Sequence, residues 1–196
     1  MSDTKEYIIN KSYELFLTHN YEAVSISDIS KAIGFTKGAL YHHFLNKEEL
    51  FMAVVDKYLI LPQVTCDLQA TTFKEYIDLS IVEMRKIMDI YLGFSSDFNP
   101  LNHIALFIDA SRNYPGFRER KETYINKETK NSEIIIENSI KRGELRDDIN
   151  VSITASNLTA LCMGFAGNML LNTNSPEDAY ELLKKQLLEY YKILKK

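Results

Sequence analysis

Apolar residues recur every three or four positions through most of this chain, which is the spacing of amphipathic helices. No sustained alternation of apolar and polar residues indicates a strand. Near the N-terminus the pattern predicts helices over residues 4–19, from Ser25 to about 33, over about 37–44, and from Asn46 to 61, where Pro62 stops the last one. We therefore predict an all-α protein that begins with a small helical domain.

The remainder of the chain predicts longer helices, over residues 73–94, 100–114, 117–142, 150–171 and 176–194. Proline and glycine mark most of their ends, as at Pro115-Gly116 and Gly143. We place the domain boundary at residue 62, which gives an N-terminal domain of residues 1–62 and a larger helical domain of residues 63–196.

Turn and capping signals between residues 25 and 50 define a helix-turn-helix motif, at about residues 25–44. Ser25 is the N-cap of its first helix, Gly34 suits the left-handed residue that closes that helix, and Thr36 caps the second. Asn46, with Glu49 three residues later, forms a capping box for the following helix. This motif places its second helix in a DNA major groove, so the pattern indicates a DNA-binding protein.

The second helix of the motif has two distinct faces at 100° per residue. Leu40 and Phe44 share the inner face, which we expect to pack on the first helix of the motif. Lys37, Gly38, Tyr41 and His42 remain on the outer face, where they suit contacts to base edges and phosphates. The alternative is that Tyr41 and the adjacent histidines only pack and meet solvent.

A metal site at His42 and His43 is not expected, because adjacent helical residues point about 100° apart and no cysteine or carboxylate lies at ligand spacing. We expect no cofactor. Cys66 and Cys162 are far apart in apolar contexts, which is typical of reduced thiols in a cytoplasmic protein. No run of ~18 apolar residues predicts a membrane span, and the polar N-terminus does not resemble a secretory signal.

The charge balance makes local placement of lysines decisive for DNA binding. The 196 residues carry a net charge of −4, and residues 1–60 contain six lysines and no arginine against eight acidic residues. Phosphate contacts must therefore come from single residues, above all Lys37 and Lys47, with Lys31 or Lys5 as further candidates and the N-terminal ends of helices adding partial positive charge. We expect modest non-specific affinity.

The stretches SISDIS, KAIG, TKGALYHHF and NKEEL together resemble the TetR-type (TetR/AcrR) bacterial transcriptional regulators, over residues of about 4–55. The resemblance implies an all-helical homodimer with an N-terminal DNA-binding domain and a C-terminal domain for ligand binding and dimerisation. It implies binding to a palindromic DNA operator and, more often than activation, repression. By position the DNA-facing residues are Ser25, Ser27, Thr36, Lys37, Gly38, Ala39, Tyr41, His42, His43 and Lys47. Many relatives carry a basic residue where this chain has Ser27.

The last two predicted helices carry matching apolar stripes, which suit a four-helix bundle between two chains. The stripe residues are Leu158, Leu161, Phe165, Met169, Leu183, Leu187, Tyr190 and Leu194. The alternative is that this helix pair packs only within its own chain.

The middle helices mix aromatic bulk with polar groups, as ligand clefts do. We expect contacts to a small-molecule effector of unspecified identity from Met84, Met88, Tyr91, Phe94, Phe98, His103, Phe107, Arg112 and Tyr124, with plain core packing as the alternative for each. Two other classes of function remain to be weighed. An enzyme is disfavoured because no catalytic motif occurs, whereas a helical protein–protein adaptor with a degenerate helix-turn-helix fits the acidic net charge.

Overall fold

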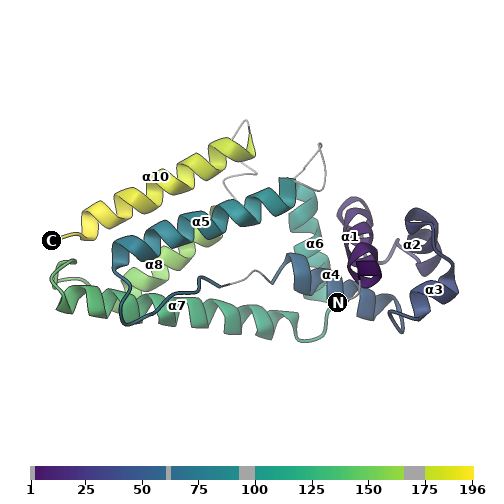
Figure 1. The fold of residues 1–196 in the computed structure, drawn as a ribbon, viewed down its shortest axis with the longest axis horizontal. Helices are drawn as coiled ribbons and strands as arrows, with labels where there is room; N and C mark the ends of the chain where they lie inside the picture. Colours follow the sequence, from purple (N-terminus) through teal and green to yellow (C-terminus); the bar gives the residue numbers. More distant parts are fainter. Residues whose placement is uncertain (1–2, 61–62, 93–99, 166–174) are drawn as a thin grey trace. The chain divides into compact units, whose positions relative to one another are not determined.

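The computed structural model describes residues 3–60, 63–92, 100–165 and 175–196. Within these ranges the chain folds into helices and contains no strand, apart from one isolated antiparallel bridge between Leu145 and Lys195 (Figure 1). The all-α prediction is confirmed. No helix among the described residues is both long and apolar enough to cross a membrane.

The chain forms two compact units. Unit 1 comprises residues Met1–Leu61 and Asn99–Lys121, and unit 2 comprises Pro62–Phe98 and Glu122–Lys196. The sequence-based boundary at residue 62 stays a prediction, and compactness groups the segment around residues 100–121 with the N-terminal helices.

Unit 1 is built on a long first helix that packs against its neighbours through one apolar face. Its helices are α1 (Asp3–Thr18), α2 (Ile26–Ile33), α3 (Lys37–Tyr41), α4 (Lys47–Tyr58) and α6 (Pro100–Asn113). α1 packs against α2, α4 and α6, and α3 packs against α2. Ile8, Tyr13 and Phe51 are fully buried between these helices, so burial of their apolar surface holds the short helices in place.

Local capping fixes the ends of the short helices, as the sequence predicts. The hydroxyl of Ser25 accepts from the backbone N–H of Asp28, and the Asp28 carboxylate accepts from the Ser25 N–H, which forms a complete capping box. Gly34 ends α2 with φ 77°, a left-handed conformation that is strained for residues that carry a side chain. Thr36 and Asn46 cap α3 and α4.

Two N-terminal helices are shorter than the sequence pattern indicates. α3 spans five residues and ends at Tyr41, so His43 and Phe44 lie beyond it. α4 ends at Tyr58 with Leu59 as its C-cap, so it is shorter than the helix to residue 61 that the sequence predicts. The carboxylate of Glu49 accepts from the N–H of Leu45, one residue before the cap, instead of closing a reciprocal box with Asn46.

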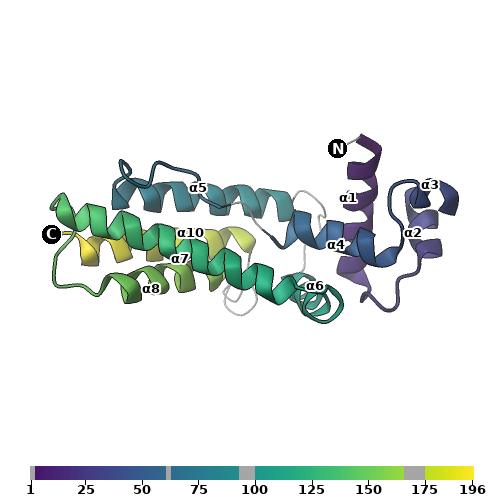
Figure 2. The same cartoon turned by 90° about the horizontal axis from the view of Figure 1, so that it is seen from below.

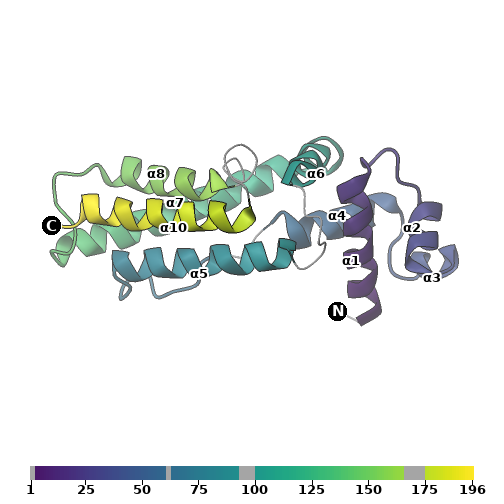
Figure 3. The same cartoon turned by 90° about the horizontal axis from the view of Figure 1, so that it is seen from above.

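Unit 2 is a bundle in which the helices run side by side (Figure 2, Figure 3). Its helices are α5 (Phe73–Leu92), most of α7 (Phe117–Lys141), α8 (Val151–Met163) and α10 (Pro176–Leu194). α10 packs against α5 and α8, around a core that includes Phe73, Ile77, Ile135 and Leu187. α8 ends at Met163 with Gly164 as its C-cap, so the helix predicted to residue 171 is interrupted at Gly164; residues 166–171 of that prediction lie outside the described residues.

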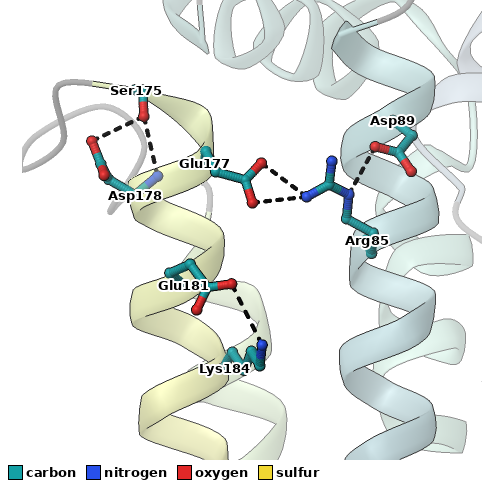
Figure 4. Close-up of polar contacts among 7 residues, drawn as sticks. All are labelled: Arg85, Asp89, Ser175, Glu177, Asp178, Glu181 and Lys184. Carbon is teal, nitrogen blue, oxygen red and sulfur yellow. Dashed lines mark hydrogen bonds and ion pairs between the residues drawn. The ribbon is translucent and has the colours of Figure 1, made fainter.

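An ion pair on the surface of unit 2 joins the two helices that lie on either side of it (Figure 4). The Arg85 Nη1 on α5 donates to both carboxylate oxygens of Glu177 on α10 at 2.8 Å, and its Nε donates to Asp89 at 2.9 Å. Ser175 caps α10 through Asp178. Because these groups are exposed, solvent screens the pair and it contributes little stability.

Candidate nucleic-acid interface

The turn between α2 and α3 is held by backbone and hydroxyl hydrogen bonds. The N–H groups of Gly34 and Phe35 both donate to the Ser30 carbonyl at 3.1 Å, and the buried Ser30 hydroxyl donates to the Phe35 carbonyl. Leu40 and Phe44 are almost fully buried, as the two-face analysis predicts. The angle between α2 and α3 is therefore set by packing and by hydrogen bonds together.

The outer face of α3 is open to solvent. Lys37, Gly38, Tyr41 and His42 are exposed, and half of the Tyr41 side chain (51%) is accessible. A Cβ at Gly38 would meet only the Thr36 hydroxyl at 3.9 Å, so glycine is not needed there to avoid a clash. Its lack of a side chain instead leaves the backbone of α3 uncovered at this surface. One cation, a flat aromatic ring with a hydroxyl, and an imidazole can thus approach a groove from a single face.

The remaining predicted DNA-facing residues differ in their availability. The hydroxyls of Ser25 and Thr36 already cap helices, and both side chains are exposed. Ser27, Ala39 and His43 are half-buried. The structure brings all of these residues into the same small region of α2, α3 and their caps, and their contacts to DNA stay a prediction.

Lys47 at the start of α4 is already engaged inside unit 1. Its ammonium nitrogen donates to the Tyr21 carbonyl at 2.9 Å and lies 4.0 Å from the centroid of the Tyr21 ring. The side chain is half-buried as a result. These contacts give Lys47 a structural role that competes with the phosphate contact expected from the sequence.

Tyr21 also ties the turn between α1 and α2 to α6. Its backbone N–H donates to the Asp109 carboxylate at 2.7 Å, and its ring packs 4.5 Å from the Phe51 ring. Asp109 is 88 residues away in the chain, so no local pattern could reveal this contact. Tyr21 and Asp109 are positioning residues that the sequence analysis missed.

A second set of contacts joins α1 and α4 to α6 through aromatic and polar side chains. The Tyr13 and Tyr58 rings stack at 3.8 Å, and the Tyr13 hydroxyl lies 3.4 Å from Nδ1 of His103. Burial, with a smaller contribution from the positive charge of Lys121, lowers the pKa of His103 to about 4, so the imidazole is neutral at pH 7. His103 was expected to contact an effector, and the structure places it in this internal cluster of unit 1.

The other residues predicted to contact an effector fall in both units. Phe107 and Arg112 lie exposed on α6 in unit 1, whereas Met84, Met88 and Tyr124 belong to unit 2, where Met88 is fully buried. Tyr91, Phe94 and Phe98 lie outside the residues whose side chains are described. An open depression of about 530 Å³ on α5 involves none of this set; it is lined by Ala70, Thr71, Glu75, Asp78, Leu79 and Val82.

The residues of the predicted dimer stripe pack inside unit 2. Leu158, Leu183, Leu187, Leu194 and Phe165 are buried in its core, and Leu161 packs against them. The Tyr190 hydroxyl donates to the Thr154 carbonyl at 2.8 Å, which joins α10 to α8 within the chain. Met169 lies outside the described residues. This packing fits the alternative in which the stripe serves its own chain, and a role of these residues between chains stays a prediction.

Within the described ranges, no three histidine, cysteine or carboxylate side chains gather in a way that could hold a metal ion. Both cysteines are half-buried free thiols.

Comparison with known proteins points to one family. Residues 8–54 match the family model described as "Bacterial regulatory proteins, tetR family". Among curated proteins, the chain is 35% identical over 96 residues to the transposon Tn10 TetC protein of Escherichia coli, a match that covers 49% of this chain and 46% of that protein. It is 42% identical over 55 residues to the transcriptional repressor ComR of E. coli K12, covering 28% and 26%. The chain thus spans less than half the length of these curated relatives.

Solved structures resemble the chain over its full length. A TetR transcription regulator from Haloarcula marismortui has a TM-score of 0.72 at 16% identity and covers 100% of both chains. A complex of SmeT with triclosan has a TM-score of 0.63 at 21% identity and covers 95% of this chain and 90% of that one. At these identities the likeness establishes the fold. The match over residues 8–54 shows that the N-terminal part of this chain is a helix-turn-helix domain of the tetR type.

Proposed function

We propose that this protein is a sequence-specific, DNA-binding transcriptional regulator that acts as a ligand-responsive repressor. The observation that carries the proposal is the capped and hydrogen-bonded α2–α3 turn, which presents Lys37, Gly38 and Tyr41 on one open face. A helix-turn-helix uses this face to read base edges in the major groove. The repressor ComR is 42% identical to this chain over 55 residues.

The protein binds its operator as a homodimer, because a palindromic site needs two recognition helices about 34 Å apart. Since the apolar stripe of α8 and α10 is occupied within the chain, the second copy uses the outer faces of these helices. α8 contains no charged residue, and Ile153 and Met163 on it are more than half exposed. Leu182 and Ile193 are exposed on α10. Exposed apolar side chains on two adjacent helices favour burial against another chain.

The effector is a small molecule bound by the C-terminal helices. SmeT, whose structure resembles this chain, forms a complex with the small molecule triclosan. Binding shifts the population of dimers toward one in which the two recognition helices no longer match their groove spacing. The packing of α4 against α6, and the 2.8 Å ion pair between Asp56 on α4 and Arg120 in the first turn of α7, are suited to pass such a shift to the DNA-reading helices.

Fluorescence anisotropy with duplex DNA from upstream of the protein's own gene tests the proposal, at two salt concentrations and against a scrambled duplex. We expect tight, salt-sensitive binding confined to the native duplex. Lys37→Ala and Tyr41→Ala should weaken it, whereas Lys185→Ala, which removes an exposed lysine from α10, should not. If the native duplex binds no better than scrambled DNA, genome-wide selection of bound fragments follows, and a selection that recovers no preferred sequence refutes the proposal.

The dimer surface is tested by sedimentation of Ile153→Glu, with Ile90→Glu on α5 as the matched exposed control. We expect the first change to yield monomers and the second to leave dimers. A dimer in both variants would place the interface elsewhere.

A further inference from the structure

A carboxylate lies buried in unit 2 without a complete set of hydrogen-bond partners. Glu128 is on α7, and its Oε1 atom is sealed from solvent with no hydrogen-bond partner among the described residues. No ion pair to Glu128 occurs in the described parts of the chain, and the neighbouring Lys127 is exposed. A buried carboxylate oxygen that accepts nothing costs free energy, and proteins seldom keep one without a use.

The groups around Glu128 come from three helices. Ser132, one turn later on α7, donates to the Glu128 carbonyl at 3.0 Å and to the buried Tyr76 hydroxyl on α5 at 3.3 Å. Tyr124 lies one turn earlier on α7 and is half-buried, and Cys162 on α8 is also half-buried. The cluster therefore combines two phenol rings and a thiol near one carboxylate, and the Ser132 hydroxyl joins the Glu128 backbone to Tyr76.

The members of the cluster affect one another's pKa values. Burial raises the pKa of Glu128, and a hydrogen bond from Tyr76 opposes this rise only in part. Burial and the Glu128 charge together raise the pKa of Tyr124 to about 12 and that of the Cys162 thiol to about 11. Around the carboxylate, the tyrosines and the thiol therefore stay neutral at pH 7, and none of them supplies a positive charge.

We propose that Glu128 anchors a site in unit 2 for a small organic ammonium ion, in which an N–H⁺ group donates to Oε1 and the rings of Tyr76 and Tyr124 face the cation. An ammonium group supplies a donor for Oε1 and a counter-charge for the carboxylate. Tyrosine rings add to this attraction through their negative faces. The inference rests on the proposed function, because it gives the chemical class of the effector.

Matched pairs of ligands that differ only in charge test the site in the full-length protein. Hexylammonium and 1-hexanol, benzylammonium and benzyl alcohol, and phenethylammonium and phenethyl alcohol serve as probes in isothermal titration calorimetry at pH 7. We expect at least one ammonium ion to bind about 10- to 100-fold more tightly than its alcohol, the range that a charge-assisted hydrogen bond supplies. Equal affinity within all three pairs would overturn the proposal.

Glu128→Gln removes the charge and keeps the shape, so it should abolish the preference for the ammonium ion. Glu122→Gln removes an exposed carboxylate from the same helix and should leave the preference intact. A Glu128→Gln protein that still prefers the ammonium ion would refute the assignment. In the absence of ligand, Glu128→Gln should also raise the melting temperature, because a neutral amide is cheaper to bury. A lower melting temperature would mean that the carboxylate is satisfied within the chain, which contradicts the premise.

The same protein samples, titrated with operator DNA, separate this inference from the proposed function. Specific DNA binding without any ammonium preference would overturn the site alone. An ammonium preference that depends on Glu128, in a protein that binds no specific DNA, would overturn the regulator alone.

Discussion

Replacing Lys47 by methionine distinguishes a structural lysine from a phosphate contact. Methionine keeps most of the apolar stem and removes the ammonium group, which donates to the Tyr21 carbonyl at 2.9 Å and lies 4.0 Å from the centre of the Tyr21 ring. Because Tyr21 is bound to Asp109 on α6, loss of the ammonium group loosens the turn between α1 and α2.

The expected loss of stability follows from these two contacts. A hydrogen bond from a charged donor contributes about 1.5–3 kcal/mol, and a cation–π contact about 0.5–1 kcal/mol at an exposed site. Lys47 is only half-buried, so solvent screens both contacts and about 2 kcal/mol in total is expected. For a chain of this size, this corresponds to a fall in melting temperature of about 4–8 °C.

Thermal unfolding followed by circular dichroism at 222 nm measures the loss, and the salt dependence of DNA binding measures phosphate contacts. Lys37→Met is the matched control, because Lys37 is exposed on α3. We expect Lys37→Met to leave the melting temperature unchanged and to reduce the salt slope by about 0.9 if Lys37 contacts a phosphate. Lys47→Met should lower the melting temperature and leave the slope unchanged. A reduced slope with an unchanged melting temperature for Lys47→Met would refute this reasoning.

Three further predictions concern base reading, backbone conformation and pH. Lys37→Ala should relax preference at one operator position by ~1–3 kcal/mol if the lysine reads a base, measured by anisotropy with base-substituted duplexes; a uniform loss over all duplexes would contradict this. Gly34→Ala should destabilise the protein by about 1–2 kcal/mol in urea unfolding because Gly34 has φ 77°, whereas Gly38→Ala in α3 should not destabilise it; equal losses would exclude backbone strain as the cause. Because the pKa of His103 falls to about 4 in the folded state, the unfolded state binds the extra proton below pH 6.5. Stability should therefore decrease by up to roughly 3 kcal/mol between pH 6.5 and 4, and His103→Gln but not His42→Gln should remove this decrease.

The capping residues could be predicted from the sequence alone. Ser25, Gly34, Thr36 and Asn46 act where they were predicted to act, because each cap depends on backbone groups within about four residues. The burial of Leu40 and Phe44 was predictable for a similar reason, since helical periodicity alone divides the residues between two faces.

The length of α3 and the role of Lys47 were not predictable in this way. Helical periodicity does not say where a short helix stops, and α3 ends at Tyr41 although the apolar pattern continues to Phe44. The partner of Lys47 is 26 residues away, and the partner of Tyr21 is 88 residues away. Such contacts exist only once α1, α4 and α6 are packed together.

The sequence by itself therefore determined the helical class, the helix-turn-helix and most helix ends, because these depend on interactions between residues close together in the chain. Only the tertiary structure decided what each apolar or charged side chain meets. The stripe of Leu158 and Leu187 illustrates the difference: its spacing requires burial, and packing within unit 2 supplies that burial inside the chain. Glu128 illustrates it for charge, since a carboxylate in a charged helical sequence is usually solvated, and only the folded structure buries its Oε1 atom.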